Sequence, residues 1–176
     1  MKKSGAYSVR ISGLNDGVHE FGFDLGNSFF KLFDHPDISG GAVKALIIME
    51  KKPGLLTVNF DLTGEVSVVC DRCLDHYPQA IEVKEKMYVK FGDKSEEINE
   101  DIILIQRDEY EIVVDQFLFE FIILGLPSRR THPDNDDGEP GCNEEMMEKL
   151  NEHLVRNDNT TDPRWDDLKR LIEKKN

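Results

Sequence analysis

The clearest regularity in the chain is a two-residue alternation of hydrophobic and polar positions between residues 56 and 68. Polar side chains such as Thr57, Asn59 and Asp61 stand at the odd positions. A period of two is that of a β-strand with one covered and one solvated face. The pattern therefore predicts a long strand in an antiparallel sheet. Its hydrophobic positions are Leu56, Val58, Phe60, Leu62, Val66 and Val68.

A second alternating run follows after a short interruption and predicts the partner strand of a long β-hairpin. Upstream, residues 42–52 predict a buried strand that ends before a Pro-Gly pair, and residues 7–14 predict a shorter strand. Residues 21–33 pass from alternation to an amphipathic segment, which predicts a strand and then a short helix. The hydrophobic positions of the second run are Ile81, Val83, Met87, Val89 and Phe91.

The chain after this hairpin is predicted to form a polar, charged loop at residues 92–101 and a short strand at 102–106. Hydrophobic side chains then recur at helical spacing up to Pro127, with Glu120 as the only charge among them. We therefore expect a core helix packed on the apolar face of the sheet. Its spaced residues are Phe117, Leu118, Phe121, Ile122 and Leu124.

Residues 128–142 contain no large apolar side chain, which predicts a surface loop. Asn143 then caps a predicted helix with Glu144 and Glu145 in its first turn. Residues 162–175 carry the start and stop signals of a second helix. The inner face of the first helix is predicted to be Met147, Leu150 and Leu154.

Together these elements predict an α+β fold: a curved antiparallel sheet or partly open barrel with a core helix and a C-terminal helical pair. The predicted parts are a sheet-plus-helix core domain at residues 1–127, a polar loop at 128–142 that forms the arm of a metal site, and the helical pair at 143–176. A chain of 176 residues has the size of one domain with an appendage.

The charge of the chain narrows the choice of partners. It has 35 acidic and 22 basic residues, a net charge of −13, with 39% hydrophobic residues. Such a chain repels phosphate backbones at long range. This counts against wrapping nucleic acid over a broad face, but it leaves room for a local basic patch or a basic protein partner.

The N-terminal residues include two lysines but no following apolar run, and no stretch is apolar over the length of a membrane span. We therefore expect a cytoplasmic protein without a membrane partner. In a reducing compartment, a chain with three cysteines is not expected to form a disulfide framework. Its C-x2-C pair is better interpreted as metal-binding or catalytic.

Cys70 and Cys73 form that pair, at the tip of the predicted hairpin. A tight turn there is the setting of a zinc knuckle, in which two thiolates face one ion. A thioredoxin-type pair precedes a helix, whereas here Pro78 and a strand follow. Three interpretations stay open: half of a zinc site, reduced cysteines without metal, and a redox pair.

A structural zinc site needs four ligands, and two further candidates lie in the polar loop. The hypothesis is a Cys3His site formed by Cys70, Cys73, Cys142 and His132, which would tie the loop to the sheet. His76, which follows the pair at C-x2-C-x2-H spacing, is the weaker candidate for the fourth ligand.

The chain has no GxSxG, Gly-rich phosphate loop or HExxH motif, so no enzyme activity or small-molecule substrate is evident. Three arginines are the candidates for partner binding. Arg72 stands between the two cysteines of the hairpin tip, where its guanidinium can fork onto phosphate or carboxylate. Arg129 and Arg130 follow the predicted core helix.

Several motifs in fixed order resemble the YceD family. They are CDRC at the end of an alternating strand, an apolar helix closing with Leu-Pro, the later His132 and Cys142, and a C-terminal DPRWDDLKRL. The resemblance covers roughly residues 40–175. The matching residues are Cys70, Arg72, Cys73, His132 and Cys142, with Asp162, Pro163 and Leu168 in the last helix. Members with several cysteines in the later segment differ from this chain, which keeps one.

The resemblance implies a role in accumulation of the large-subunit ribosomal RNA, without catalytic activity. On this basis the first hypothesis is a non-enzymatic ribosome-assembly factor that binds a large-subunit ribosomal protein or ribosomal RNA. The net charge favours the protein partner over bare RNA. The alternative is a thiol-redox protein or enzyme that uses Cys70 and Cys73.

Overall fold

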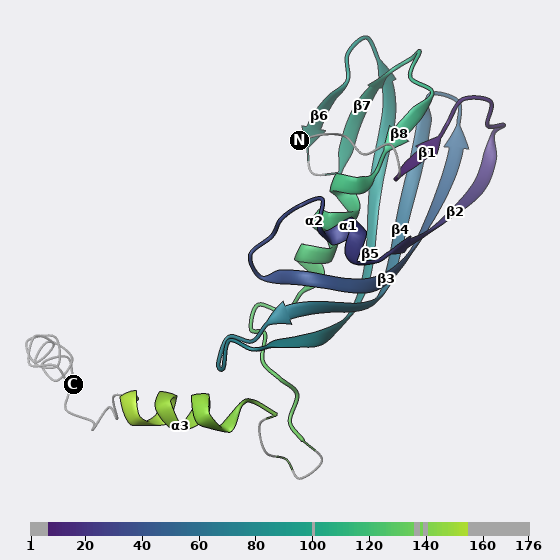
Figure 1. Cartoon of the computed structure of the whole chain (residues 1–176). Helices are drawn as coiled ribbons and strands as arrows, with labels where there is room; N and C mark the ends of the chain where they lie inside the picture. The colour runs from purple at the N-terminus through teal and green to yellow at the C-terminus, as the bar shows by residue number, and fades with distance from the viewer. Residues whose placement is uncertain (1–6, 100, 136–137, 139–140, 155–176) are drawn as a thin grey trace, which may run out of the picture. The chain divides into compact units, whose positions relative to one another are not determined.

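The structure is a computed structural model that describes residues 7–99, 101–135, 138 and 141–154. The chain divides into two compact units, Met1–Cys142 and Asn143–Asn176, which are described separately below. In chain order the elements are β1 (Ser8–Arg10), β2 (Gly17–Leu25), α1 (Asn27–Phe30), β3 (Ile38–Lys52), β4 (Leu55–Val69), β5 (His76–Gly92), β6 (Glu96–Asn99), β7 (Ile102–Gln106), β8 (Glu111–Val113), α2 (Asp115–Gly125) and α3 (Glu144–His153) (Figure 1).

The first unit is built on an open six-stranded sheet with the strand order β2-β3-β4-β5-β7-β6. Its long central strands bend strongly along their length (Figure 1). The predicted α+β fold with a curved, partly open sheet is therefore confirmed. The sheet is antiparallel except that β5 and β7 pair in parallel, from Tyr88–Ile102 to Gly92–Gln106. The chain passes from β5 to β6, which pairs on the far side of β7, and only then returns as β7 between those two strands. For this reason β7 enters the sheet in the same direction as β5.

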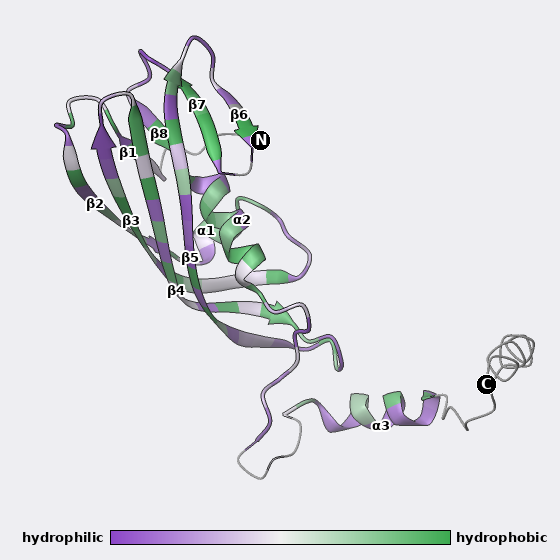
Figure 2. Cartoon of the chain, turned by 180° about the vertical axis from the view of Figure 1, so that it is seen from behind, coloured by the Kyte–Doolittle hydropathy of each residue, from purple (hydrophilic) through white to green (hydrophobic). Residues whose placement is uncertain are grey.

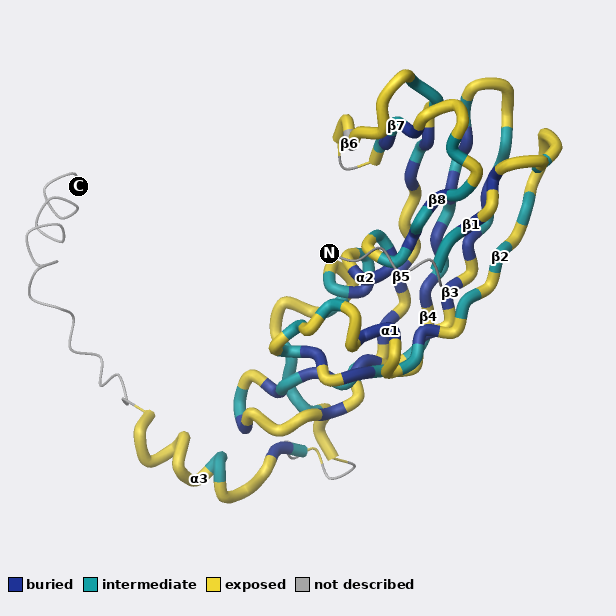
Figure 3. Tube along the Cα trace, turned by 45° about the horizontal axis from the view of Figure 1, so that its top comes forward, coloured by how far each residue is buried: buried dark blue, intermediate teal, exposed yellow. Residues whose placement is uncertain are grey.

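The predicted alternation along the hairpin is confirmed. In β4 the even positions from 56 to 62 and at 66 and 68 are buried, and the odd positions are half-buried or exposed. Figure 3 shows the same alternation of buried and accessible residues along β3, β4 and β5. Seen from behind, these strands also alternate between hydrophobic and hydrophilic residues (Figure 2). One face of the sheet is therefore the core face, as the period of two requires.

Two elements cover that core face: α1 and α2, beside a two-stranded ribbon of β1 and β8 (Figure 1). In α2 the side chains of Leu118, Phe119 and Ile122 are buried. Phe119 stacks on Phe33, with ring centroids 4.1 Å apart and an interplanar angle of 4°. The prediction that Leu124 belongs to the core face is wrong, because its side chain is 74% exposed. Phe119 takes its place because α1 and the chain after it, not only the sheet, pack against α2.

Two further predictions are corrected, and one strand was not predicted. The predicted loop at residues 92–101 contains strand β6, whose pairing with β7 overrides its polar composition. The segment before the core helix contains strand β8, which pairs with β1 far away in the sequence. The predicted strand at residues 7–14 is reduced to Ser8–Arg10.

The second unit contains α3, whose predicted cap is confirmed. The Asn143 side chain accepts a hydrogen bond from the backbone N–H of Met146 at 3.3 Å, and Glu144 and Glu145 lie in the first turn. On its predicted inner face, Leu150 and Leu154 are 41% and 57% exposed. The second predicted helix, at residues 162–175, lies outside the described residues. The division at residues 127 and 142 into independent parts stays a prediction.

None of the helices in the described part of the chain has the length and apolar character needed to cross a membrane.

Candidate metal centre

The first half of the site is the turn that joins β4 to β5. The backbone N–H of Cys70 donates to the carbonyl of Asp75 at 2.9 Å, and the N–H of Leu74 donates to the carbonyl of Cys70 at 3.0 Å. Leu74 has a φ of 63°, a left-handed conformation that closes the turn. The result is that Cys70 and Cys73 are both buried, at 0% and 1% exposure.

The second half of the site is the segment 128–142, which is tied to this turn by Arg130. The backbone N–H of Asp71 donates to the carbonyl of Arg130 at 2.7 Å, and the N–H of Arg130 donates to Asp71 Oδ2 at 2.6 Å. The guanidinium forms ion pairs with Asp37 at 3.1 Å and with Asp71 at 3.4 Å. These contacts hold the segment against the hairpin tip, two residues before His132.

A short internal bond then returns the segment toward the hairpin. The backbone N–H of Gly141 donates to the carbonyl of Pro133 at 3.1 Å, which brings Cys142 back beside His132. The imidazole of His132 lies against the ring of Tyr77 on β5, with ring centroids 4.8 Å apart. Both side chains of this segment therefore face the two cysteines of the turn.

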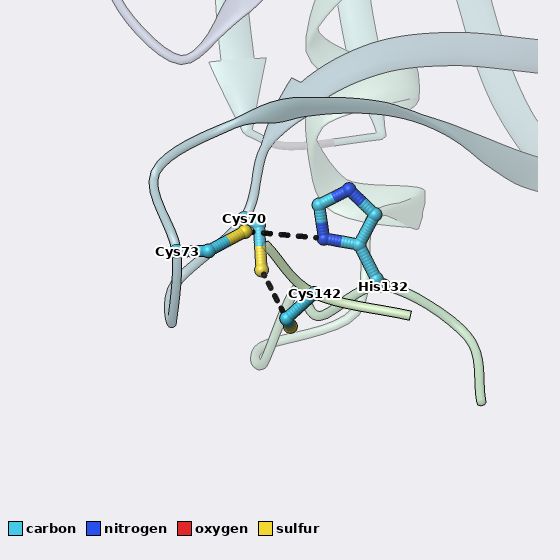
Figure 4. Close-up of side chains that lie close together, drawn as sticks. All are labelled: Cys70, Cys73, His132 and Cys142. Carbon is cyan, nitrogen blue, oxygen red and sulfur yellow. Dashed lines mark hydrogen bonds between the residues drawn. The ribbon is translucent and has the colours of Figure 1, made fainter. Parts of the chain in front are cut away.

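The four side chains of Cys70, Cys73, His132 and Cys142 converge on one point (Figure 4). Their ligand atoms all lie within 4.8 Å of one another, which is close enough to hold a metal ion. The Sγ atoms of Cys70 and Cys142 are 3.8 Å apart, and Cys73 Sγ lies 3.4 Å from His132 Nδ1. Zinc–sulfur bonds of about 2.3 Å in a tetrahedron place sulfurs about 3.8 Å apart, so this donor set fits a tetrahedral ion.

The electrostatics of the cluster favour a negative charge on Cys70. Burial raises the pKa of this thiol, but hydrogen bonds from the backbone N–H groups of Cys73, Arg72 and His132 outweigh it and lower the pKa from 9.0 to about 6. The N–H of Arg72 lies 3.4 Å from the sulfur. Burial raises the pKa of Cys142, and the neighbouring Cys70 sulfur raises it further. A cation among the four groups would offset this accumulation of negative charge.

The remaining predicted residues lie around the cluster. His76 is exposed at the start of β5 and does not belong to the group of four. Arg72 is half-buried in the turn, Arg129 is exposed, and Arg130 is held by the two carboxylates described above. Asp37 and Asp71 were not predicted to support the site. An aspartate 93 residues from the arginine that it contacts carries no local signal of its role.

Comparison with known proteins gives one match. A family model described as Large ribosomal RNA subunit accumulation protein YceD matches residues 58–172, which is more than half of the chain. The matched range includes all four residues of the cluster. No curated protein and no solved structure matches the chain.

Proposed function

The chain belongs to the YceD family, and from this premise we propose that it is a non-enzymatic binding factor in large-subunit ribosome assembly. The family's name implies a role in accumulation of the large-subunit ribosomal RNA. The observation that carries the proposal is that the matched residues contain the whole Cys/His cluster, so the family match and the site concern the same part of the molecule.

The ion of the proposed site is zinc, and its role is structural. Three thiols and one imidazole are the donors of structural zinc sites. When bound, zinc would act only as a cross-link between the hairpin tip and the segment 128–142. Because the protein fills four positions, a tetrahedral ion has no open position for water or substrate. Asp37, Asp71 and Arg130 support the ligands by holding the two segments together.

The lowered pKa of Cys70 is the one observation that favours a thiol-redox function instead. Burial argues against that function. A thiolate must reach the disulfide that it attacks, and Cys70 and Cys73 are 0% and 1% exposed. The same N–H groups that lower the pKa of Cys70 also favour the thiolate that a metal ion requires. We therefore assign the cluster to metal binding.

The partner surface that we propose lies on the outside of the cluster. Leu74 is 64% exposed at the hairpin tip, next to the second cysteine. Arg72 and Arg129 stand on the turn and on the segment beside it. Arg130 contributes by position, since its guanidinium is held by Asp37 and Asp71. The arginines of this surface would fork onto carboxylates of the partner, while the net charge of −13 favours a basic large-subunit protein over bare ribosomal RNA.

The test is the level of large-subunit ribosomal RNA relative to small-subunit RNA in cells that lack the protein. We expect a lowered ratio that the wild-type gene restores and that Cys142→Ser does not. In a parallel purification, the tagged chain should retain large-subunit components at low salt and lose them at high salt. An unchanged ratio in the deletion strain would refute the proposal, and a Cys142→Ser gene that restores the ratio as fully as the wild type would refute the role of the Cys/His cluster.

A further inference from the structure

A groove of about 690 Å³ lies among β7, β8 and the start of α2, and it shares no residue with the Cys/His cluster. Its apolar lining includes Leu104 of β7 and Phe117 of α2, which are both half-buried. Tyr110, at the entry to β8, also lines it and is 62% exposed. The groove therefore offers accessible apolar surface that the fold itself leaves partly uncovered.

The charged residues that line the groove all have the same sign. They are Glu96, Glu109, Glu111 and Asp115, and no lysine, arginine or histidine lines it. Among the described residues, Glu96, Glu109 and Glu111 take part in no ion pair. Glu109 accepts a hydrogen bond from Ser95 at 2.6 Å and Glu111 accepts one from Ser8 at 2.9 Å. Each carboxylate has further lone pairs, so each can still accept a hydrogen bond from a lysine or arginine side chain.

One backbone edge faces the groove as well. β8 pairs with β1, and no other described strand pairs with it. The N–H of Val114 donates to Tyr7 at 2.9 Å and the N–H of Ile11 donates to Tyr110 at 2.8 Å, so the even-numbered residues of this strand bond toward β1. In an antiparallel ladder the backbone groups alternate, so those of Glu111 and Val113 point to the opposite edge. Both residues line the groove.

We propose that this acidic groove binds an extended, lysine- or arginine-rich protein segment, which adds a strand to the open edge of β8. Alternate side chains of that segment would place cations against the glutamates and apolar groups against Leu104 and Phe117. RNA does not fit here, because its phosphates would meet four carboxylates. This inference rests on the proposed function in one respect, because the basic segment is taken to belong to a large-subunit ribosomal protein.

The test is the binding of the full chain to a fluorescent peptide of about ten alternating lysines and valines, measured by anisotropy. Glu109→Gln with Glu111→Gln removes two charges from the groove and keeps the acceptors for Ser95 and Ser8. The matched control is Glu20→Gln with Glu65→Gln, two exposed acids on β2 and β4. We expect the groove pair to weaken binding about tenfold and the control pair to leave it nearly unchanged.

Two altered probes separate the parts of the mechanism. A peptide N-methylated at every residue should lose binding, because it has no backbone N–H left to donate to the edge of β8. A lysine–serine peptide should bind more weakly, because it has no apolar groups for the groove. Equal weakening by both pairs of substitutions would mean that only net charge matters and would overturn the proposal. So would a single-stranded RNA that binds the wild type and is lost in the groove pair.

The remaining occupant is a second copy of the chain. If light scattering gives a dimer for the wild type and a monomer for the groove pair, the groove is a self-association site and the proposal is wrong. The proposed function fails separately, when loss of the gene leaves the ribosomal RNA ratio unchanged. If cells with the groove pair keep a normal ratio, the ribosomal role stands, and the assignment of the groove to a large-subunit protein fails.

Discussion

The sulfur atoms of Cys70 and Cys142 lie 3.8 Å apart although 72 residues separate them in the chain. Both are free cysteines. The distance is far above the about 2.05 Å of a disulfide and close to the separation of two ligands of a tetrahedral zinc ion. The hairpin tip and the end of the polar segment are thus held at the spacing that one shared ion requires.

Loss of either ligand from the polar segment should abolish stable metal binding. We predict about one zinc per chain in the wild type after dialysis against a weak chelator, and little or none in Cys142→Ser and His132→Ala. His76→Ala is the matched control, because His76 is exposed and outside the cluster. Metal analysis of the three variants decides the matter. Zinc that persists in both ligand variants would show that the four residues are not the site.

The stability of the metal-free chain should depend on the thiol of Cys70. Its pKa falls from 9.0 to about 6 in the folded chain, so between these values the unfolded chain binds more protons. The free energy of unfolding therefore rises with pH across this window, and the contribution is lost as the pH falls through about 6. We predict that urea unfolding between about pH 6 and pH 8 shows this rise in the wild type and a smaller one in Cys70→Ser. Parallel curves would contradict the lowered pKa.

Arg130 should stabilise the site without being a ligand. Its side chain is 23% exposed, and its guanidinium pairs with Asp37 and Asp71. We predict that Arg130→Ala lowers the free energy of unfolding by about 1 kcal/mol and weakens zinc affinity. Arg129→Ala, at the exposed neighbouring position, should change neither quantity. Thermal unfolding and competition with a metal-sensitive dye measure the two effects, and equal effects of both substitutions would remove the assigned role of Arg130.

The long strands and the four clustered residues were accessible to sequence reasoning because their signals are local. The alternation in β4 records burial on one face, and the C-x2-C spacing marks a tight turn whichever strand follows. His132 and Cys142 stand out because residues 128–142 have no apolar side chains that a core could use.

The features that sequence reasoning missed depend on contacts between distant segments. Strand β6 is a strand because β7 offers it an edge, and strand β8 because β1 lies beside it. Phe119 is buried because Phe33 covers it, which helical spacing alone does not encode. The tie from Arg130 to Asp37 likewise joins residues 93 positions apart. Tertiary context decides such cases, and single-sequence patterns carry little of it.

Leu74 should lower the stability of the fold through its backbone conformation, while its side chain contributes to binding the partner. Its φ of 63° is a left-handed conformation, and its side chain is 64% exposed. Such a backbone disfavours any residue with a Cβ, whereas glycine adopts it freely. We predict that Leu74→Gly raises the free energy of unfolding by about 1 kcal/mol. Leu74→Ala should give no such gain, because alanine keeps the Cβ and the strain.

The same two variants test whether the exposed leucine binds the partner. Both lack the isobutyl group, so both should reduce the amount of large-subunit material that the tagged chain retains, although only Leu74→Gly is more stable. If Leu74→Gly is more stable but retains less of the partner, the loss of binding cannot come from a loss of folding. The leucine would then act in recognition. If Leu74→Gly is more stable and retains the partner as well as the wild type does, the leucine is not part of the binding surface. Recognition would then rest on Arg72 and Arg129.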